Sequence, residues 1–220
     1  PYFSYYQPGF FYLASAMPHQ LPALRAIGLA VSFLLLTGFL GMWRLVGTRF
    51  GSGAGILAGA LFVLSTYAST EIWVRGDFAE LTAMMLMPLQ MGALLWWRRS
   101  RTCLSLAALS LATVALLISH APVAFVTLLL IGVYICIEDL LIGRSLRNAL
   151  LSGLPILCGV LLAAFYWFPI VLEWNLVQPE LAFAGLYGYS RHFIDLRELA
   201  GPAGAGHALV PVALGLPMLL

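Results

Sequence analysis

The chain has 220 residues, of which 62% are hydrophobic and only 9% are charged, and its formal net charge is +2. Soluble domains carry roughly 25% charged residues, so this supply cannot cover a surface exposed to water. The composition excludes a water-soluble globular enzyme, a disordered chain and a nucleic-acid binder with a basic face.

A helix that crosses a bilayer needs about 20 residues, so the length accommodates six or seven passes. We therefore expect an all-α fold, a polytopic transmembrane helical bundle with six spans and a partial seventh, in a single domain over residues 1–220. The chain opens on Pro1 without an initiator Met and stops inside the apolar run 211–220, so we also expect a fragment of a longer protein.

An aromatic segment, at about residues 1–24, precedes the first predicted span and holds seven aromatic residues among its first twelve. Tyrosine favours the membrane interface, which predicts an aromatic belt or a re-entrant segment. The alternative is a wall of aromatic faces for a lipid-linked or sugar substrate, with Tyr6 and Tyr12 in contact with that substrate. Several residues argue against a continuous helix here, namely Pro1, Pro8, Gly9, Pro18 and Pro22.

Apolar runs bounded by charged residues predict the spans. They lie at about 26–46, 53–69, 81–97, two within 102–137, one at 150–172, and a partial seventh from about Ala208. The run 102–137 is too long for one span and contains Ser119-His120-Ala121-Pro122. We predict a helical hairpin there, with Pro122 in the first turn of its second helix.

Small residues recur on the second span, where Gly51, Gly55 and Gly59 are spaced four residues apart. This pattern predicts a close approach between two helix backbones.

The longest connection is an outer loop at about residues 175–206. Apolar residues beside its charges predict a short amphipathic helix lying on the membrane. Long loops on a rigid scaffold also carry binding sites, and His192 with Asp195 three residues later could orient a proton carrier. Under that alternative His192 is a candidate catalytic residue and Arg191 a candidate substrate ligand.

The arginines predict the orientation of the bundle. Seven of them follow the first, third and fifth spans and fall on one side: Arg44, Arg49, Arg98, Arg99, Arg101, Arg144 and Arg147. The positive-inside rule places that side in the cytoplasm. Seven of the nine acidic residues and all four histidines then lie outside, so we expect any chemistry at the extracytoplasmic face.

The sharpest short motif is Arg75-Gly76-Asp77-Phe78-Ala79-Glu80, at the outer end of the third span. One interpretation is structural, because Asp77 can cap the helix with Glu80 at capping-box spacing. The other is functional, because the fork of Arg75 suits a phosphate or carboxylate beside free helix N–H groups. Ionisable groups at a membrane boundary are costly unless they are paired or used, and the sequence leaves both interpretations open.

Two further polar residues are candidate substrate ligands. His120 at the hairpin tip fits a polar turn residue, with a role in proton transfer as the alternative. Glu173 follows an aromatic run, Phe165-Tyr-Trp-Phe-Pro169, close to the predicted membrane edge.

Metal and disulfide chemistry receive little support. Cys103, Cys136 and Cys158 all lie in apolar stretches, which predicts no disulfide framework. No CxxC or HxxxH spacing occurs, so we expect no structural metal site. No cofactor is indicated, and a divalent cation stays an open question.

Four features resemble a bacterial membrane-protein family labelled "6-pyruvoyl-tetrahydropterin synthase-related". They are Tyr6-Gln7-Pro8-Gly9-Phe10-Phe11-Tyr12; Val74-Arg75-Gly76-Asp77-Phe78-Ala79-Glu80 leading into Leu86-Met87-Pro88-Leu89; Ser119-His120; and Phe165-Tyr-Trp-Phe-Pro169 with Glu173, Val177-Gln178 and His192-Phe193. The label points to a soluble pterin enzyme that binds zinc through clustered histidines. The histidines here are scattered, so pterin synthase activity is not expected.

In architecture the family is similar to the C-type integral-membrane glycosyltransferases. Such enzymes take a sugar from a polyprenyl-phosphate carrier on the outer face and use an acid on the first outer loop. That loop follows a first helix that this fragment is expected to lack, so the resemblance maps the principal acid onto no residue here.

The sequence thus leads to a hypothesis of a glycosyltransferase-like protein of the bacterial inner membrane, with the bilayer and a polyprenyl-phosphate-linked sugar as partners and no nucleic acid. Arg75 would hold the phosphate, and Asp77 or Glu80 would orient the acceptor or support the missing acid. His192 would line the acceptor side. The alternative is a non-catalytic transporter or lipid-binding scaffold, for which charged residues facing each other across a midplane cavity are expected.

Overall fold

The computed structural model describes residues 7–143 and 145–173, and every regular element in these two ranges is helical. In chain order the elements are α2 (Gly9–Ser15), α3 (Ala23–Phe50), α4 (Ser52–Val63), α5 (Thr66–Thr70), the π-helical turn η1 (Glu71–Arg75), α6 (Phe78–Ser100), α7 (Cys103–Ser119), α8 (Ala121–Ile135), the π-helical segment η2 (Cys136–Ile142), α9 (Leu146–Leu162) and α10 (Ala164–Leu172). The all-α prediction is confirmed for this part of the chain.

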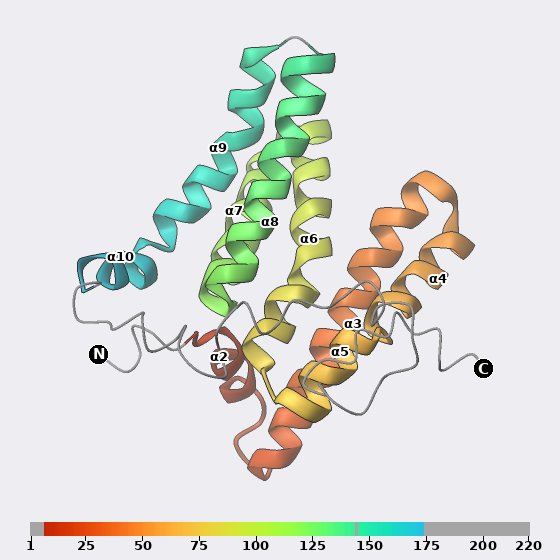
Figure 1. Cartoon of the computed structure of the whole chain (residues 1–220), viewed down its shortest axis with the longest axis vertical. Helices are drawn as coiled ribbons and strands as arrows, with labels where there is room; N and C mark the ends of the chain where they lie inside the picture. Colours follow the sequence, from red (N-terminus) through yellow and green to blue (C-terminus); the bar gives the residue numbers. More distant parts are fainter. Residues whose placement is uncertain (1–6, 144, 174–220) are drawn as a thin grey trace, which may run out of the picture.

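The long helices run alternately in opposite directions (Figure 1). Helix α6 is central, with α3 packed on one side and α7 on the other, while α4 packs on α3 and α9 packs on α7. One end of the bundle, the arginine-rich end, holds the α3–α4, α6–α7 and η2–α9 connections. The opposite end, the acidic end, holds α2, η1, the start of α6 and the α7–α8 connection.

Four helical segments are long and apolar enough to cross a membrane: Ala23–Phe50, Ser52–Arg75, Phe78–Ser100 and Ala121–Ile142. The bent pair Leu146–Leu162 and Ala164–Leu172 makes a fifth if it counts as one span, and the apolar helix Cys103–Ser119 is shorter. The described residues therefore support four or five spans by length and composition, and the count of six is not confirmed. The partial seventh span, near Ala208, lies outside the described residues.

The sixth predicted span, 150–172, is not one straight helix. Helices α9 and α10 meet at Ala163 with a bend of 65°. At the bend the indole Nε1 of Trp167 donates to the carbonyl oxygen of Val160 at 2.8 Å. In a continuous helix that carbonyl would accept the backbone N–H four residues later. The Trp167 side chain therefore satisfies a backbone group that the bend releases, as an apolar environment requires.

The predicted hairpin at His120 is present, and the short helix α2 of the aromatic segment packs against its first helix. Helix α7 ends at Ser119, α8 begins at Ala121, and a proline, Pro122, stands in the first turn of α8. Gly9 of α2 lies against the end of α7, where a Cβ on Gly9 would come within 2.8 Å of Ser119 Cα.

Phe10 of α2 anchors the aromatic segment in the core. Its side chain is buried and stacks on Phe78 with ring centroids 4.7 Å apart. The described part of the segment, with the short helix α2, is therefore broken as predicted. Because Phe10 is buried, however, the segment is partly core and not simply a belt facing lipid.

An ion pair and one proline-related contact join the helices at the arginine-rich end. Arg98 of α6 pairs with Asp139 of η2 through two hydrogen bonds of 2.8 and 3.1 Å, and the hydroxyl of Ser152 donates to the same carboxylate. Pro155 cannot donate to the carbonyl oxygen of Leu151, and Trp97 Nε1 donates to that oxygen instead at 2.7 Å. Helices α6 and α9 are thus joined where the proline leaves a backbone acceptor open.

The close approach of helix backbones that the glycine pattern predicts is confirmed at Gly55 and Gly59, where α4 packs on α3. Gly55 and Gly59 are buried, and a Cβ on Gly59 would lie 2.9 Å from the carbonyl oxygen of Phe39. Gly51 has a different role, because it ends α3 with φ of +90°, a conformation that side chains rarely adopt.

Candidate functional site

A tight turn at the acidic end places the charged motif at the start of α6. The π-helical turn η1 ends at Arg75, Gly76 takes the left-handed conformation with φ of +64°, and Asp77 becomes the N-cap of α6. Asp77 Oδ1 accepts the backbone N–H of Glu80 at 3.0 Å, which confirms the predicted cap. Because the chain reverses direction at Gly76, the side chain of Arg75, the last residue of η1, lies beside the first turn of α6.

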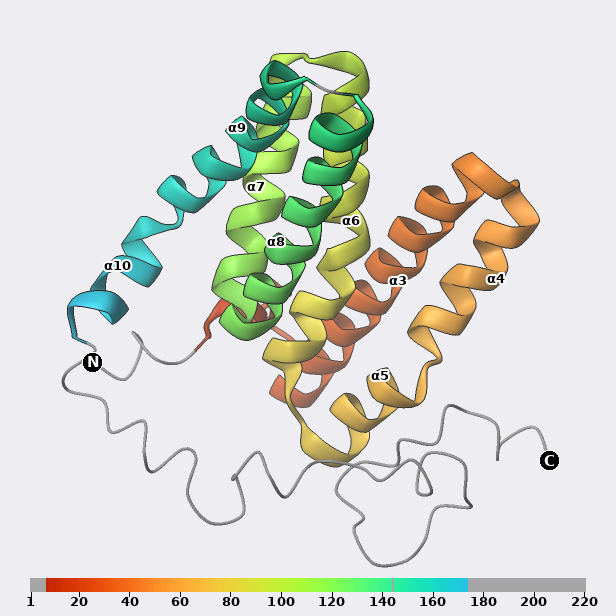
Figure 2. The same cartoon turned by 45° about the horizontal axis from the view of Figure 1, so that its top comes forward.

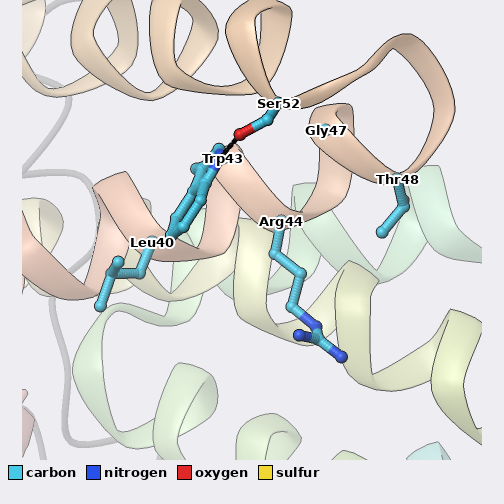
Figure 3. Close-up of a pocket in the computed structure, with 6 residues that line it drawn as sticks. All are labelled: Leu40, Trp43, Arg44, Gly47, Thr48 and Ser52. Atoms are coloured by element: carbon cyan, nitrogen blue, oxygen red, sulfur yellow. Dashed lines mark hydrogen bonds between the residues drawn. The ribbon is translucent and has the colours of Figure 1, made fainter.

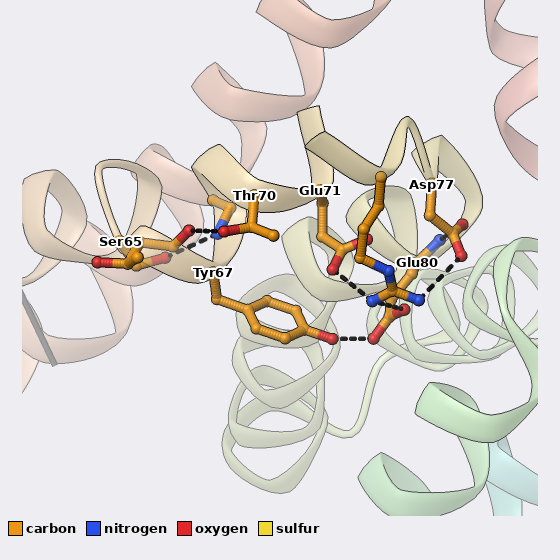
Figure 4. A network of polar contacts seen from close by, with 9 residues as sticks. Ser65, Tyr67, Thr70, Glu71, Asp77 and Glu80 are labelled. Carbon is orange, nitrogen blue, oxygen red and sulfur yellow. Dashed lines mark hydrogen bonds and ion pairs between the residues drawn. The ribbon is translucent and has the colours of Figure 1, made fainter. Parts of the chain in front are cut away.

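Arg75 is shared by three carboxylates (Figure 4). Its Nη1 lies 2.6 Å from Glu71 Oε1 and 3.0 Å from Glu80 Oε2, and its Nη2 lies 3.7 Å from Asp77 Oδ2. Glu71 is fully buried, and its second oxygen has no hydrogen-bond partner among the described residues. With three carboxylates and one guanidinium the cluster is acidic by formal charge, so an anion that binds Arg75 has to take the place of one of these carboxylates.

Tyr67 completes the cluster by donating a hydrogen bond from its hydroxyl to Glu80 Oε1 (Figure 4). Ser65 caps α5, because its hydroxyl oxygen accepts the backbone N–H of Ala68, and so fixes the start of the helix that carries Tyr67. Both oxygens of Glu80 are therefore engaged, one by Tyr67 and one by Arg75. In a complete capping box, the Glu80 carboxylate would also accept the backbone N–H of Asp77. Here Tyr67 and Arg75 hold that carboxylate instead.

A cavity of about 370 Å³ opens beside the cluster. Its walls come from α2, the η1–α6 turn and the α7–α8 connection, with the lining residues Gln7, Phe11, Arg75, Gly76, Asp77, Phe78, Ala79 and His120. Gln7 contributes an amide oxygen that is buried without a hydrogen-bond partner among the described residues. The cavity thus combines aromatic rings with polar groups from three separate segments.

Among the described residues, Asp77, Glu80 and His120 form a group that could hold a metal ion, since their ligand atoms lie within 4.8 Å of one another. His120 Nδ1 already accepts the backbone N–H of Val123 at 3.3 Å as the cap of α8. In the neutral ring this contact leaves the proton on Nε2, which is then a hydrogen-bond donor rather than a metal ligand. A cation at Nε2 would require the loss of that cap, whereas the two carboxylates need no such change.

The structure brings together four of the predicted site residues, namely Arg75, Asp77, Glu80 and His120. Tyr12 lies on α2 with an exposed side chain and does not line the cavity, and Glu173, at the end of α10, does not line it either. Tyr6, Arg191 and His192 lie outside the described residues.

Sequence reasoning did not single out Tyr67, Glu71 or Gln7 as parts of the site. One signal was available, because Glu71 and Arg75 are four residues apart and such a pair shares a helix face. The role of Tyr67 depends on the break after α4, which the apolar pattern did not reveal.

A model of the 6-pyruvoyl-tetrahydropterin synthase related domain, described as a membrane protein, matches residues 3–186. No curated protein and no solved structure matches the chain. The matched range includes the whole cluster around Arg75, the cavity beside it and all the described helices. The chain therefore belongs to the 6-pyruvoyl-tetrahydropterin synthase related family of membrane proteins.

Proposed function

We propose that this protein is a membrane-embedded glycosyltransferase-like enzyme that takes a sugar from a polyprenyl-phosphate donor at the acidic-end cavity. The observation that carries the proposal is the shared lining of this cavity by Arg75, Asp77 and His120, with the rings of Phe11 and Phe78 beside them. A lipid-linked donor suits this position, because its chain can stay in the bilayer while its phosphate and sugar reach a cavity at the ends of the helices.

The roles of the two acids follow from their contacts. Glu80 is held by Tyr67 and Arg75 and is mostly buried, so it acts as a fixed charge. Asp77 has a more exposed side chain, 33%, and makes the longest ion pair of the cluster. Asp77 is therefore the better placed acid to orient an acceptor hydroxyl and to face the positive charge that develops on the sugar.

In the proposed transfer, the bond between the anomeric carbon and the phosphate oxygen breaks, and a bond to the acceptor oxygen forms. The acceptor hydroxyl gives its proton to the Asp77 carboxylate that orients it, and polyprenyl phosphate leaves with the bonding electron pair. Arg75 would reach the phosphate by exchanging its contact of 3.7 Å with Asp77, while its shorter pairs with Glu71 and Glu80 remain. His120 Nε2–H would donate to a phosphate or acceptor oxygen, and His192 is assigned to the acceptor side.

A transporter, the main alternative, predicts charged groups that face each other across a midplane cavity. Both ion-pair clusters among the described residues lie at helix ends. The buried polar pair near the middle of α6, Gln90 with Thr113, is uncharged. This distribution favours chemistry at one boundary over ion-coupled transport.

The test uses membranes that contain the protein and a panel of radiolabelled polyprenyl-phosphate sugars, with release of polyprenyl phosphate as the readout. Asp77→Asn is the informative variant, because asparagine caps a helix about as well as aspartate and only the charge is lost. We expect turnover to fall about 100-fold or more. Glu138→Gln, an acid near the opposite end, is the matched control and should retain turnover. Unchanged turnover in Asp77→Asn would exclude the assigned role.

A further inference from the structure

A second cavity, of about 400 Å³, lies at the arginine-rich end of the bundle, opposite the proposed active site. Figure 3 shows the residues that line it. It is lined by Leu40, Trp43, Arg44, Gly47, Thr48 and Ser52. The first five residues repeat at helical spacing along one face of α3, and Ser52 is the first residue of α4. The cavity is therefore built by the end of one helix and the turn into the next.

Helix α3 packs on α6 just before it reaches this cavity, whose described lining residues all belong to α3 and α4. Gly41 lies close to α6, where a Cβ on Gly41 would come within 3.1 Å of Pro88 Cβ. Beyond this contact α3 and α6 diverge toward the arginine-rich end, as two views of the bundle show (Figures 1 and 2). Gly47, which also lines the cavity, lies close to α4, because a Cβ on Gly47 would be 3.6 Å from Trp43 Cδ1 and 3.8 Å from Gly55 Cα.

Arg44 extends from α3 on this face (Figure 3). Its side chain is exposed, and no carboxylate of the described residues forms an ion pair with it, in contrast to Arg75 and Arg98. Ser52 Oγ accepts the indole N–H of Trp43 at 3.2 Å, so the proton of the Ser52 hydroxyl is available to a further acceptor. The cavity thus offers an unpaired guanidinium and a hydroxyl donor.

We propose that this cavity binds the phosphate of an anionic phospholipid headgroup. The fork of an arginine matches phosphate oxygens, and basic pockets between transmembrane helices at the membrane surface bind such headgroups. Leu40 lies one helical turn before Arg44 on the same face, and Trp43 is half polar and half apolar, so the glycerol and acyl parts also find contacts. These apolar contacts favour a lipid over a free phosphate ion.

The bound lipid would contact the end of α3 and the first residue of α4, and would hold the α3–α4 turn in place. A ligand that binds only the folded state stabilises it in proportion to its occupancy. Phosphatidylglycerol should therefore raise the melting temperature of the full chain more than phosphatidylcholine does. This inference is independent of the proposed enzyme activity.

The test measures binding of phosphatidylglycerol to the detergent-solubilised chain by native mass spectrometry, together with the melting temperature. Arg44→Gln should weaken binding about fivefold and remove the lipid-dependent stabilisation, because one arginine near the membrane surface contributes about that factor. Arg44→Lys keeps the charge and loses the fork, so it should bind more weakly than the unchanged chain and more tightly than Arg44→Gln. Arg99→Gln is the matched control, because Arg99 is exposed at the same end and does not line the cavity.

Three results would overturn the inference. Equal losses in Arg44→Gln and Arg99→Gln would show a general effect of surface charge. Equal stabilisation by phosphatidylcholine would show that the headgroup charge is not recognised. Equal stabilisation by inorganic phosphate at the same concentration would show a site for a free anion. Arg44→Gln removes no hydrogen bond or ion pair within the described residues, so folding of this variant is expected and its helical content can be checked directly.

Discussion

At the acidic end, Arg75 stabilises the fold independently of any catalytic role. Glu71 is fully buried, and its partner among the described residues is Arg75, at 2.6 Å. Removing one member of a buried ion pair leaves the other charge uncompensated, which destabilises a protein strongly. A loss of activity in Arg75→Gln would therefore mix folding with function, whereas Asp77→Asn separates them.

Tyr67→Phe tests whether the fixed geometry of Glu80 matters for turnover. The change removes the hydroxyl that donates to Glu80 Oε1 and leaves the ring in place. We expect the free energy of unfolding to fall by about 1 kcal/mol, the usual contribution of one hydrogen bond. If Tyr67 positions Glu80 for the proposed transfer, kcat falls while KM for the polyprenyl-phosphate donor stays the same.

Tyr134→Phe is the control for this prediction. Tyr134 lies at the opposite end, where its ring contacts Arg98, and the change keeps that ring. A fall of kcat in Tyr134→Phe equal to that in Tyr67→Phe would contradict a positioning role for Tyr67.

Individual residues of the site were predictable to different degrees. The cap at Asp77 follows from local spacing, because a short polar side chain before a helical run accepts the N–H three residues later. The contacts of the Glu80 carboxylate could not be predicted from the same spacing. Its carboxylate binds Arg75 and Tyr67, and this depends on how η1 and α5 lie beside α6.

Among the elements, α4 shows which part of its packing the glycine spacing predicts and which part it does not. Gly55 and Gly59 pack against α3, as the four-residue spacing predicts, because a missing side chain lets two backbones approach. Gly51 shares the spacing and serves as a turn instead. Spacing alone cannot separate these roles, since the outcome depends on where α3 ends.

A pair of single-methyl changes tests this assignment. In Gly59→Ala the new Cβ would lie 2.9 Å from the carbonyl oxygen of Phe39, so the helices must shift and we expect destabilisation of about 1–3 kcal/mol. In Gly53→Ala the Cβ meets nothing within 4 Å, so we expect no loss and a gain of up to about 1 kcal/mol from helix propensity. Thermal unfolding in detergent measures both, and equal effects of the two changes would contradict the packing role.

The bend between α9 and α10 shows what the apolar pattern could not reveal. Residues 150–172 are apolar enough for one straight span. The bend lies at an alanine, Ala163, and not at a glycine or a proline. What permits the bend is the indole of Trp167, which satisfies the carbonyl of Val160 within the same segment. Hydropathy measures how apolar a segment is, and it carries no information on such a side-chain replacement of a backbone bond.

On the scale of the whole molecule, the arginines that the sequence assigns to one side do lie at one end of the bundle. The described members of that group are Arg44, Arg49, Arg98, Arg99, Arg101 and Arg147. Their common end follows from the alternating direction of the helices, which the predicted hairpin at His120 preserves. Which side of the membrane this end faces is a prediction of the positive-inside rule.

Cys103 provides a natural reporter for that orientation, because it is exposed at the start of α7, at the arginine-rich end. In a variant with Cys136→Ser and Cys158→Ser, a membrane-impermeant maleimide should label Cys103 in inverted vesicles and not in intact cells. A second variant carries Gln20→Cys together with serine at all three native cysteine positions. Gln20 is exposed at the opposite end of the bundle, so this cysteine should be labelled in intact cells and not in inverted vesicles. Labelling of Cys103 from outside would place the acidic-end cavity in the cytoplasm, where a donor presented at the outer face could not reach it.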